Sequence, residues 1–311
     1  MATATIPQTA SDELPFDERF EALLERGRTE YAAERLAEAI ETFAKAERLA
    51  EKLGDRRAVD RAFVNQCTSI LDLERNLALE HFQRLREILM AGNDLVNSWL
   101  AAYDLARAYE CTKEHRKGLF YARIALDRSG ILGLAAWRAS SHNQIGNFLL
   151  AESHFQEALD EYAQALELLP PEPSRRRALI LTNMGYARVV LGLPDGLPLL
   201  YRSLRMLRSL GAYRDQIFPL LDLCFTLVEM GRHVYALRYG VRALALAEAS
   251  GEQDSIKHAL FLLGEAAQQA GDETAARERF EQLQKRYYPD ASYLPEVLLT
   301  VDVRKLINLK A

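Results

Sequence analysis

The fold is decided by residues 139–170, which read ASSHNQIGNFLLAESHFQEALDEYAQALELLP. This stretch predicts two amphipathic helices joined by a short turn, with Gly146 on the first helix and Pro170 ending the second. On the second helix, side chains of alternating size share one stripe: Ala158, Tyr162 and Ala165. Because small residues let a neighbouring helix approach closely beside one bulky ring, the pattern favours tight pairing of the two helices.

The same pattern returns along most of the chain at steps of 39 or 40 residues. The position of Ala158 is occupied in turn by Ala39, Ala78, Gly118, Ala158, Leu197, Ala236 and Ala276. Four residues later stand Phe43, Phe82, Ala122, Tyr162, Tyr201, Gly240 and Phe280. The position of Gly146 is occupied by Gly27, Gln66, Ala106, Gly146, Gly185, Cys224 and Gly264. Seven copies in near-constant register predict seven consecutive helix pairs, each packed on its neighbours.

This arrangement resembles the tetratricopeptide repeat (TPR), whose helix pair carries a small residue, then Ala-x3-Phe/Tyr-x2-Ala, then Pro at these offsets. The resemblance covers roughly residues 18–289 and is closest to the long-period subclass of kinesin light chains and bacterial peptide-sensing regulators, since the usual period is about 34 residues. HEAT and armadillo repeats, the architectural alternative, have similar periods but a different register of small and aromatic residues. The resemblance implies an all-α fold: a right-handed α-α superhelix (TPR solenoid) of seven helix pairs plus a C-terminal capping helix.

Three segments are expected from this organisation. Residues 1–15 are small and polar and contain two prolines, which is typical of a disordered N-terminal tail. Residues 16–289 hold the seven repeats. Residues 290–311 include the amphipathic run EVLLTVDVRKLIN, which predicts the capping helix, because the last repeat of an array otherwise exposes its apolar flank.

The composition is that of a folded chain, with 49% hydrophobic and 27% charged residues. A net charge of −5 gives no general attraction to nucleic acid or to an anionic membrane. The three cysteines are far apart and form no CxxC motif, which suits a reducing compartment. No apolar run is long enough to span a bilayer and the first residues lack a signal peptide's apolar segment, so we expect a cytoplasmic protein.

Motifs for catalysis, metal binding or cofactor binding are not found. The six histidines show no HExxH or paired metal spacing, and there is no G-x-S-x-G and no phosphate-cradling glycine loop. His142 stands at a helix-packing position where other repeats carry leucine, which favours a core histidine over a metal ligand. We therefore expect a non-enzyme without metal or cofactor.

The fifth repeat is unusually basic. Between residues 174 and 214 there are eight arginines and one acid. Arg202, Arg205 and Arg208 lie three residues apart on one helix face and could dock an anion or a partner, because clustered guanidinium groups grip phosphate and carboxylate. The alternative is a solvated surface that balances acidic parts of the chain.

The resemblance to TPR proteins also implies a peptide site in the groove lined by the first helix of each pair. Carried over by register, its centre comprises Tyr103, Arg107, Asn143, Asn147, Asn183 and Tyr186. Asn143 and Asn147 are four residues apart, so both amides project from one helix face. An amide donates and accepts together, and can pair with a peptide backbone whatever its side chains are. The alternative is that these amides cap the turns of adjacent helices.

Three functions remain open on this basis. The first is a non-catalytic scaffold that holds a protein or extended peptide in the groove. The second is a regulator in which a small peptide changes the pitch of the superhelix. The third, a minor alternative that relies on the fifth repeat, is an RNA-binding array. No membrane partner is expected, and the partner's identity and the oligomeric state are left open.

Overall fold

The computed structural model describes residues 16–301, 303, 308 and 310. The described residues up to Gln144 form one compact unit and those from Ile145 form a second. The first unit contains α1 (Phe16–Ala32), α2 (Leu36–Leu53), α3 (Arg56–Glu74), α4 (Leu79–Ala91), α5 (Leu95–Cys111) and α6 (His115–Leu132), and the division falls inside α7 (Ala135–Ala151). The second unit contains α8 (Phe155–Glu167), α9 (Arg175–Val190), α10 (Gly196–Ser209), the 3-10 helix η2 (Arg214–Gln216), α11 (Ile217–Glu229), α12 (His233–Ser250), α13 (Gln253–Gln269), α14 (Glu273–Tyr287) and α15 (Leu294–Thr300).

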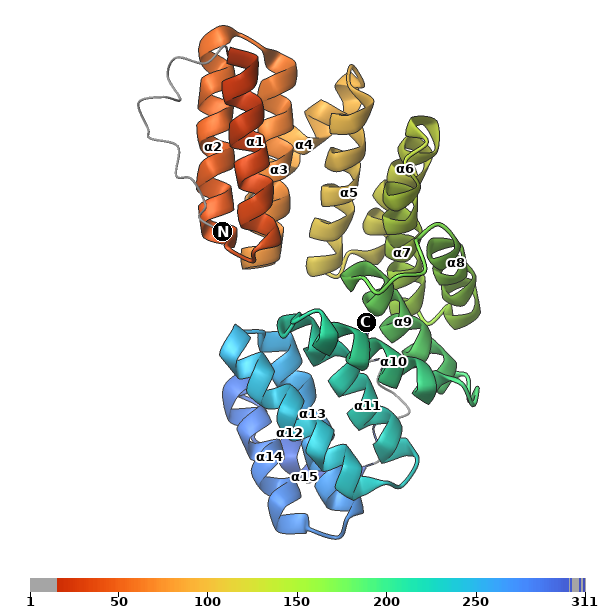
Figure 1. The fold of residues 1–311 in the computed structure, drawn as a ribbon. Helices are drawn as coiled ribbons and strands as arrows, with labels where there is room; N and C mark the ends of the chain where they lie inside the picture. Colours follow the sequence, from red (N-terminus) through yellow and green to blue (C-terminus); the bar gives the residue numbers. More distant parts are fainter. Residues whose placement is uncertain (1–15, 302, 304–307, 309, 311) are drawn as a thin grey trace, which may run out of the picture. The chain divides into compact units, whose positions relative to one another are not determined.

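Within each unit, helices that follow one another in the chain pack side by side (Figure 1). The contacts run from α1 to α2 to α3 in the first unit and from α11 to α12 to α13 in the second. The expected all-α fold of seven helix pairs followed by a C-terminal helix is confirmed. Within each unit, a pair buries its apolar stripe against the next one, as in other repeat proteins.

The predicted register is visible where a glycine faces an aromatic ring. A Cβ atom added at Gly146 on α7 would lie 2.5 Å from Cε1 of Tyr162 on α8, whose side chain is fully buried. The same approach recurs in the first and last pairs, at Gly27 with Phe43 and Gly264 with Phe280. Glycine is therefore required at these positions by the close approach of two helices.

In the fifth pair the register differs by one residue from the prediction. A Cβ atom at Gly185 would lie 2.7 Å from Cδ2 of Leu200, so Leu200 and not Tyr201 fills the aromatic position. Gly196 takes the small position that was assigned to Leu197: it is buried, and a Cβ atom there would lie 2.8 Å from the Gly185 carbonyl oxygen. Because glycine permits a closer approach than leucine, α10 rotates to bury Gly196, and Tyr201 is left half-buried.

The second pair departs from the template too. Ala78, predicted inside the second helix, is exposed and stands at the N-cap of α4. Phe82 is only half-buried, whereas Leu85 is fully buried. At the small position of α3 stands Gln66, whose long side chain opposes a close approach of the second helix, and α4 packs mainly against α5.

The first unit contains an aromatic stack made by the chain's two tryptophans. The rings of Trp99 on α5 and Trp137 on α7 lie 4.1 Å apart between centroids at an interplanar angle of 15°. The Tyr103 ring also stacks on Trp99, with ring centroids 4.9 Å apart and an interplanar angle of 13°. Trp99 also donates its indole N–H to Ser141 Oγ at 3.2 Å, so its polar atom is satisfied in the core.

The C-terminal helix is shorter than the expected capping helix. α15 ends at Thr300, and Val301 has an extended backbone (φ −117°, ψ 125°). Leu298 is buried, and Gln268 Nε2 on α13 donates to the Leu299 carbonyl oxygen at 2.6 Å, so α15 does lie against the last pair. The expected disordered tail, residues 1–15, lies outside the described residues, as do 302, 304–307, 309 and 311.

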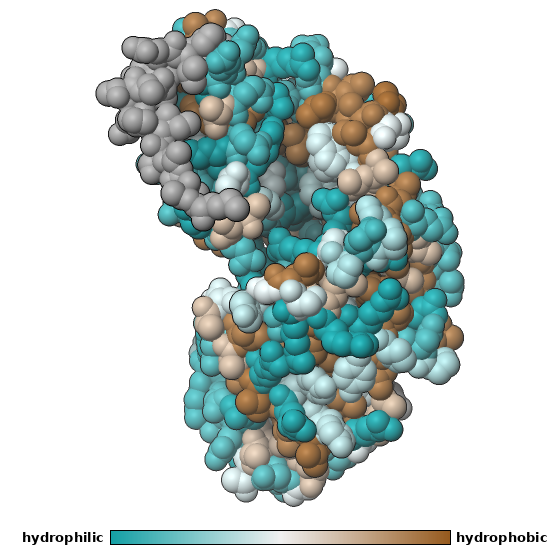
Figure 2. Space-filling model, viewed as in Figure 1, coloured by the Kyte–Doolittle hydropathy of each residue, from teal (hydrophilic) through white to brown (hydrophobic). Residues whose placement is uncertain are grey.

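The surface in Figure 2 mixes hydrophilic and hydrophobic residues on the face shown. In the part of the chain that the structure describes, no helix combines the length and apolar character needed to cross a membrane.

Candidate functional site

Two of the predicted groove residues, Tyr103 and Arg107, are held by partners within the first unit. Arg107 forms an ion pair with Asp72 on α3 and lies 3.8 Å from Asp104 on its own helix. Thr68 donates its hydroxyl to Asp104 at 2.8 Å. Tyr103 belongs to the tryptophan stack described above. Arg107 therefore stabilises the packing of α3 against α5, while Tyr103 is part of the aromatic stack of α5 and α7.

Asp104 is a fully buried carboxyl group in this cluster. Burial raises its pKa to about 7, and the negative charge of Asp72 contributes to this rise. The positive charge of Arg107 and the hydrogen bond from Thr68 lower the pKa but do not cancel the effect of burial. The cause is the cost of holding a charge away from water.

The three predicted asparagines have different surroundings. Asn147 on α7 accepts two hydrogen bonds at Oδ1, from Asn183 Nδ2 on α9 at 2.8 Å and from the Tyr162 hydroxyl at 3.0 Å. The structure thus brings Asn147 and Asn183 together, and they link α7, α8 and α9. Asn143 is half-buried, and its Oδ1 has no hydrogen-bond partner among the described residues.

Tyr186, the last predicted groove residue, contacts the C-terminal part of the chain. Its ring is 1% exposed, and its hydroxyl donates to Asn308 Oδ1 at 3.1 Å. The Asn308 amide nitrogen donates in turn to the carbonyl oxygens of Leu150 at 2.9 Å and Ala151 at 3.2 Å. These carbonyls belong to the last turn of α7, and the Leu150 oxygen also accepts from the Ser153 backbone N–H at 3.0 Å. Asn308 therefore adds a cap to the end of α7 from far along the chain.

A second contact of the same kind lies next to Asn308. Lys310 Nζ forms an ion pair at 2.9 Å with Asp222 on α11, and it stands 5.1 Å from the centre of the Tyr186 ring. Asp222 is 1% exposed, and burial raises its pKa while Lys310 opposes that rise. Because a buried carboxylate without a cation is costly, Lys310 supplies a charge that this position requires.

We call these groups the tail site: the carbonyl groups of Leu150 and Ala151, the hydroxyl and ring of Tyr186, and the carboxylate of Asp222. The Phe225 ring on α11 lies 5.7 Å from that of Tyr186 and adds an apolar wall. The tail site offers hydrogen-bond acceptors to one side-chain amide. It also offers a carboxylate to a cationic side chain that follows this amide by two residues in the occupying segment. In this structure it holds two side chains, those of Asn308 and Lys310, whereas contacts to a peptide main chain were expected for the asparagines.

Asp222 was missed among the candidate residues, although a sequence signal exists. It stands two residues before the small position of its repeat, and the same position carries Asp104, Gln144 and Asn183, at steps of 39 or 40 residues. Three of these four polar side chains are buried and Asn183 is half-buried. A polar residue at one core register in four consecutive repeats is the signal, because buried polar groups need partners.

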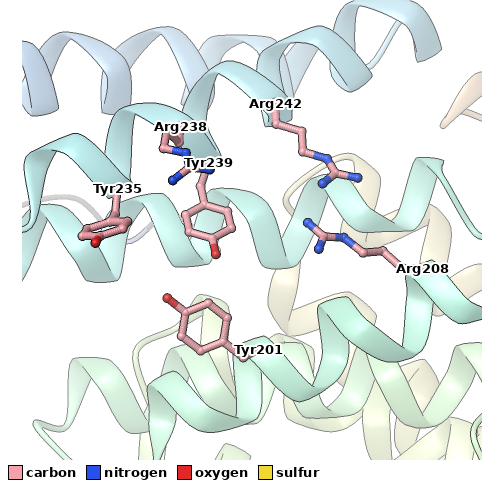
Figure 3. Close-up of a pocket in the computed structure, with 6 residues that line it drawn as sticks. All are labelled: Tyr201, Arg208, Tyr235, Arg238, Tyr239 and Arg242. Carbon is pink, nitrogen blue, oxygen red and sulfur yellow. The ribbon is translucent and has the colours of Figure 1, made fainter.

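Seven of the eight arginines of the fifth repeat separate into two groups. Four contact acids or helix ends of the fold: Arg175 with Asp215, Arg188 with Asp195, Arg214 with Glu252, and Arg177 with the carbonyl groups that end α8. The predicted trio of Arg202, Arg205 and Arg208 is exposed, and no ion pair joins it to a carboxylate within the described ranges. Arg208 lines a cleft together with Tyr201 and residues of α12 (Figure 3).

No family model and no curated protein sequence matches the chain. Several solved structures share its fold. A Rap protein complexed with competence and sporulation factor is 15% identical with a TM-score of 0.59, over 96% of this chain and 100% of that chain. The apo form of the quorum sensor NprR from B. thuringiensis is 13% identical with a TM-score of 0.61, over 89% of this chain and 79% of that one.

Aspartyl phosphate phosphatase F from Bacillus subtilis is 12% identical with a TM-score of 0.59, over 100% of this chain and 97% of that one. These neighbours are TPR proteins, so the TPR resemblance is confirmed at the level of fold. At such identities the likeness does not carry an activity.

Proposed function

We propose that this protein is a non-catalytic binder of peptide segments and that the tail site is where a segment docks. The partner is an extended peptide, or an extended part of a protein, with an amide side chain two residues before a lysine or arginine. One observation carries the proposal: Asn308 and Lys310 of the chain itself occupy the site with hydrogen bonds and an ion pair.

The chemistry of the tail site supports this ligand class. The Leu150 and Ala151 carbonyl oxygens can only accept hydrogen bonds, so a ligand must present a donor to them. The buried Asp222 carboxylate is stable as an anion only beside a cation. Tyr186 contributes both a hydroxyl donor and a ring face for the cation. A peptide that meets these requirements makes the same bonds that Asn308 and Lys310 make.

Occupation by the chain's own residues favours a regulated form of this function. A ligand peptide and the pair of Asn308 and Lys310 cannot use Asp222 at the same time, so binding releases one segment as it captures another. The apparent affinity for the ligand is then lowered by the fraction of molecules whose own segment is docked. A fold neighbour solved in complex with a factor, and another described as a quorum sensor, are consistent with a binding role of this kind.

The test measures peptide binding to the full-length chain by fluorescence anisotropy. The probe is a labelled peptide of residues 303–311, VRKLINLKA, and the receptor is the double variant Asn308→Ala/Lys310→Ala, whose own segment no longer competes. We expect roughly micromolar binding, and at least about tenfold weaker binding to wild type. Adding Asp222→Asn to the receptor should weaken binding by about tenfold, the effect of one charge-assisted contact. Adding Tyr186→Phe should weaken it by about fivefold, because the Tyr186 hydroxyl makes a neutral hydrogen bond.

A scrambled peptide of the same composition is the matched ligand control, and circular dichroism checks that each receptor variant is folded. Equal binding of the scrambled peptide, or unchanged binding to the Asp222→Asn receptor, would refute the tail site. Turnover of acyl phosphates by the purified wild-type protein would refute the non-catalytic part of the proposal.

A further inference from the structure

A cleft separate from the tail site lies between α10 and α12 in the second unit. It has a volume of about 440 Å³ and is lined by three tyrosines and three arginines: Tyr201, Arg208, Tyr235, Arg238, Tyr239 and Arg242 (Figure 3). A cavity of this size accommodates one small molecule. The proposed peptide binding does not involve any of these side chains.

The lining residues are spaced so that each helix contributes an aromatic end and a cationic end. Tyr201 and Arg208 are seven residues apart on α10, and Tyr235 and Arg242 are seven apart on α12. Seven residues are two helical turns, so the two ends are separated by about 10 Å on the same face of each helix. Figure 3 shows the side chains of Arg208 and Arg242 directed toward one another, with Tyr201 directed toward Tyr239.

The cationic end lacks compensating acids on the two helices that form it. α10 contains no acidic residue, and the acid of α12, Glu248, is in its last turn. Arg242 donates to Gln216 Oε1 at 3.3 Å, a neutral acceptor. Burial and then the charge of Arg242 lower the pKa of Arg208, as expected for two guanidinium groups that face each other. An anion between them would remove this repulsion and receive charge-assisted hydrogen bonds.

The aromatic end exists because of the register of α10. With Leu200 in the core, Tyr201 faces Tyr239, with ring centroids 6.1 Å apart and an interplanar angle of 57°. Burial, and then the Tyr239 hydroxyl, raise the pKa of the Tyr201 phenol, which therefore remains a neutral donor. Tyrosine rings and hydroxyls together suit an aromatic heterocycle with polar edges.

We propose that this cleft binds a nucleoside monophosphate, with the base at the tyrosines and the phosphate between Arg208 and Arg242. The separation of about two helical turns requires a spacer between ring and phosphate, such as a ribose. Phosphotyrosine, whose phosphate is attached directly to its ring, is too short to reach both ends. A cleft in the first unit has a similar lining, but its Lys117 is already paired with Glu114.

The experiment titrates the full-length protein at low salt with the four common nucleoside 5′-monophosphates, and separately with the corresponding nucleosides and with ribose 5-phosphate. At least one nucleotide should bind, and loss of either the base or the phosphate should weaken binding by about tenfold or more. The double variant Arg208→Ala/Arg242→Ala should lose at least about tenfold in affinity for that nucleotide. Tyr201→Ala/Tyr239→Ala should lower the affinity for the nucleotide but leave the affinity for ribose 5-phosphate unchanged.

The chain supplies a matched control. Arg202→Ala/Arg205→Ala removes the same number of positive charges, both from α10, but leaves the cleft lining intact, so nucleotide affinity should change less than about twofold. Circular dichroism verifies the fold of each variant. Absence of binding by all four nucleotides, equal affinity for ribose 5-phosphate, or equal losses in the two arginine variants would each overturn the proposal. The last result would indicate a diffuse basic surface for polyanions.

Discussion

At Gly146 the missing side chain is what allows Tyr162 to be buried. A Cβ atom there would lie 2.5 Å from the Tyr162 ring, closer than any real contact, and the ring is fully buried and has no space to move into. We expect Gly146→Ala to destabilise the protein by roughly 1–3 kcal/mol, the usual cost of overpacking a core. The measurement is the midpoint of urea unfolding followed by circular dichroism.

The control is a glycine in a similar helical setting without a neighbour. A Cβ atom at Gly130 on α6 would meet nothing within 4 Å. Gly130→Ala should therefore raise the free energy of unfolding by roughly 0.5 kcal/mol, because alanine loses less backbone entropy in a helix. The midpoint of urea unfolding should rise slightly. If both substitutions shift the midpoint in the same direction, the packing explanation of Gly146 is wrong.

Asp104 makes stability depend on pH. Its pKa is about 7 in the folded protein against an ordinary value of 3.8, so the folded state retains a proton that the unfolded state has released. This carboxyl group therefore contributes stability below about pH 4 that is lost as the pH rises to 7. In Asp104→Asn that loss is absent, and the Thr68 hydroxyl still has an acceptor.

The comparison is made by urea unfolding of wild type and Asp104→Asn at several pH values between 4 and 7.5. Wild type should lose stability relative to the variant across this interval, most steeply midway between the two pKa values, and the loss should level off above neutrality. Two parallel curves would show that the Asp104 carboxyl is not perturbed by its burial.

At the scale of one helix, the register of α10 determines which of two adjacent side chains holds the core together. Leu200 is fully buried against Gly185, whereas Tyr201 is half-buried at the cleft. We expect Leu200→Ala to cost about 2–5 kcal/mol, as for other large-to-small core substitutions, and Tyr201→Ala to cost clearly less. Thermal unfolding of the two variants distinguishes the two registers. A larger loss of stability in Tyr201→Ala than in Leu200→Ala would favour the register predicted from the sequence.

The sequence predicted most elements because packing imposes a strict pattern on them. Glycine opposite an aromatic ring, as at Gly146 and Tyr162, is a steric requirement and repeats visibly at 39 or 40 residues. The prediction was wrong where two neighbouring residues could satisfy the template. Tyr201 matches the aromatic position by residue type and places the larger Leu197 at the small position, but Gly196 permits a closer approach there. The difference emerges only when the helices are packed.

At the scale of the whole molecule, an array of helix pairs has an open end that needs a cover. α15 lies against the last pair, with Leu298 buried and with a hydrogen bond from Gln268. Deleting residues 290–311 should expose apolar surface of α13 and α14 and cause self-association. Size-exclusion chromatography with light scattering should then report a larger particle mass than for the full-length chain.

A second deletion separates the effect of the helix from that of the residues after it. Removing residues 302–311 keeps α15 but eliminates Asn308 and Lys310, so the particle mass should stay that of the full-length chain. Equal behaviour of the two deletions would mean that α15 does not cover the end of the array.

The candidate site was only partly predictable from the sequence. Register within one repeat located Asn147, Asn183 and Tyr186, since each is fixed by its own helix pair. The contacts of Asn308 and Lys310 join positions 88 to 158 residues apart in the chain. No periodic pattern encodes such a pairing, and it requires the folded molecule.

The stack of Trp99 and Trp137 has a practical spectroscopic consequence. Both tryptophans of the chain belong to the first unit, with ring centroids 4.1 Å apart. Intrinsic fluorescence excited at the red edge of the absorption band therefore reports on that unit alone, while far-ultraviolet ellipticity is summed over every helix. Recording both signals in one denaturant titration asks whether the two units melt together or in succession, without any added dye.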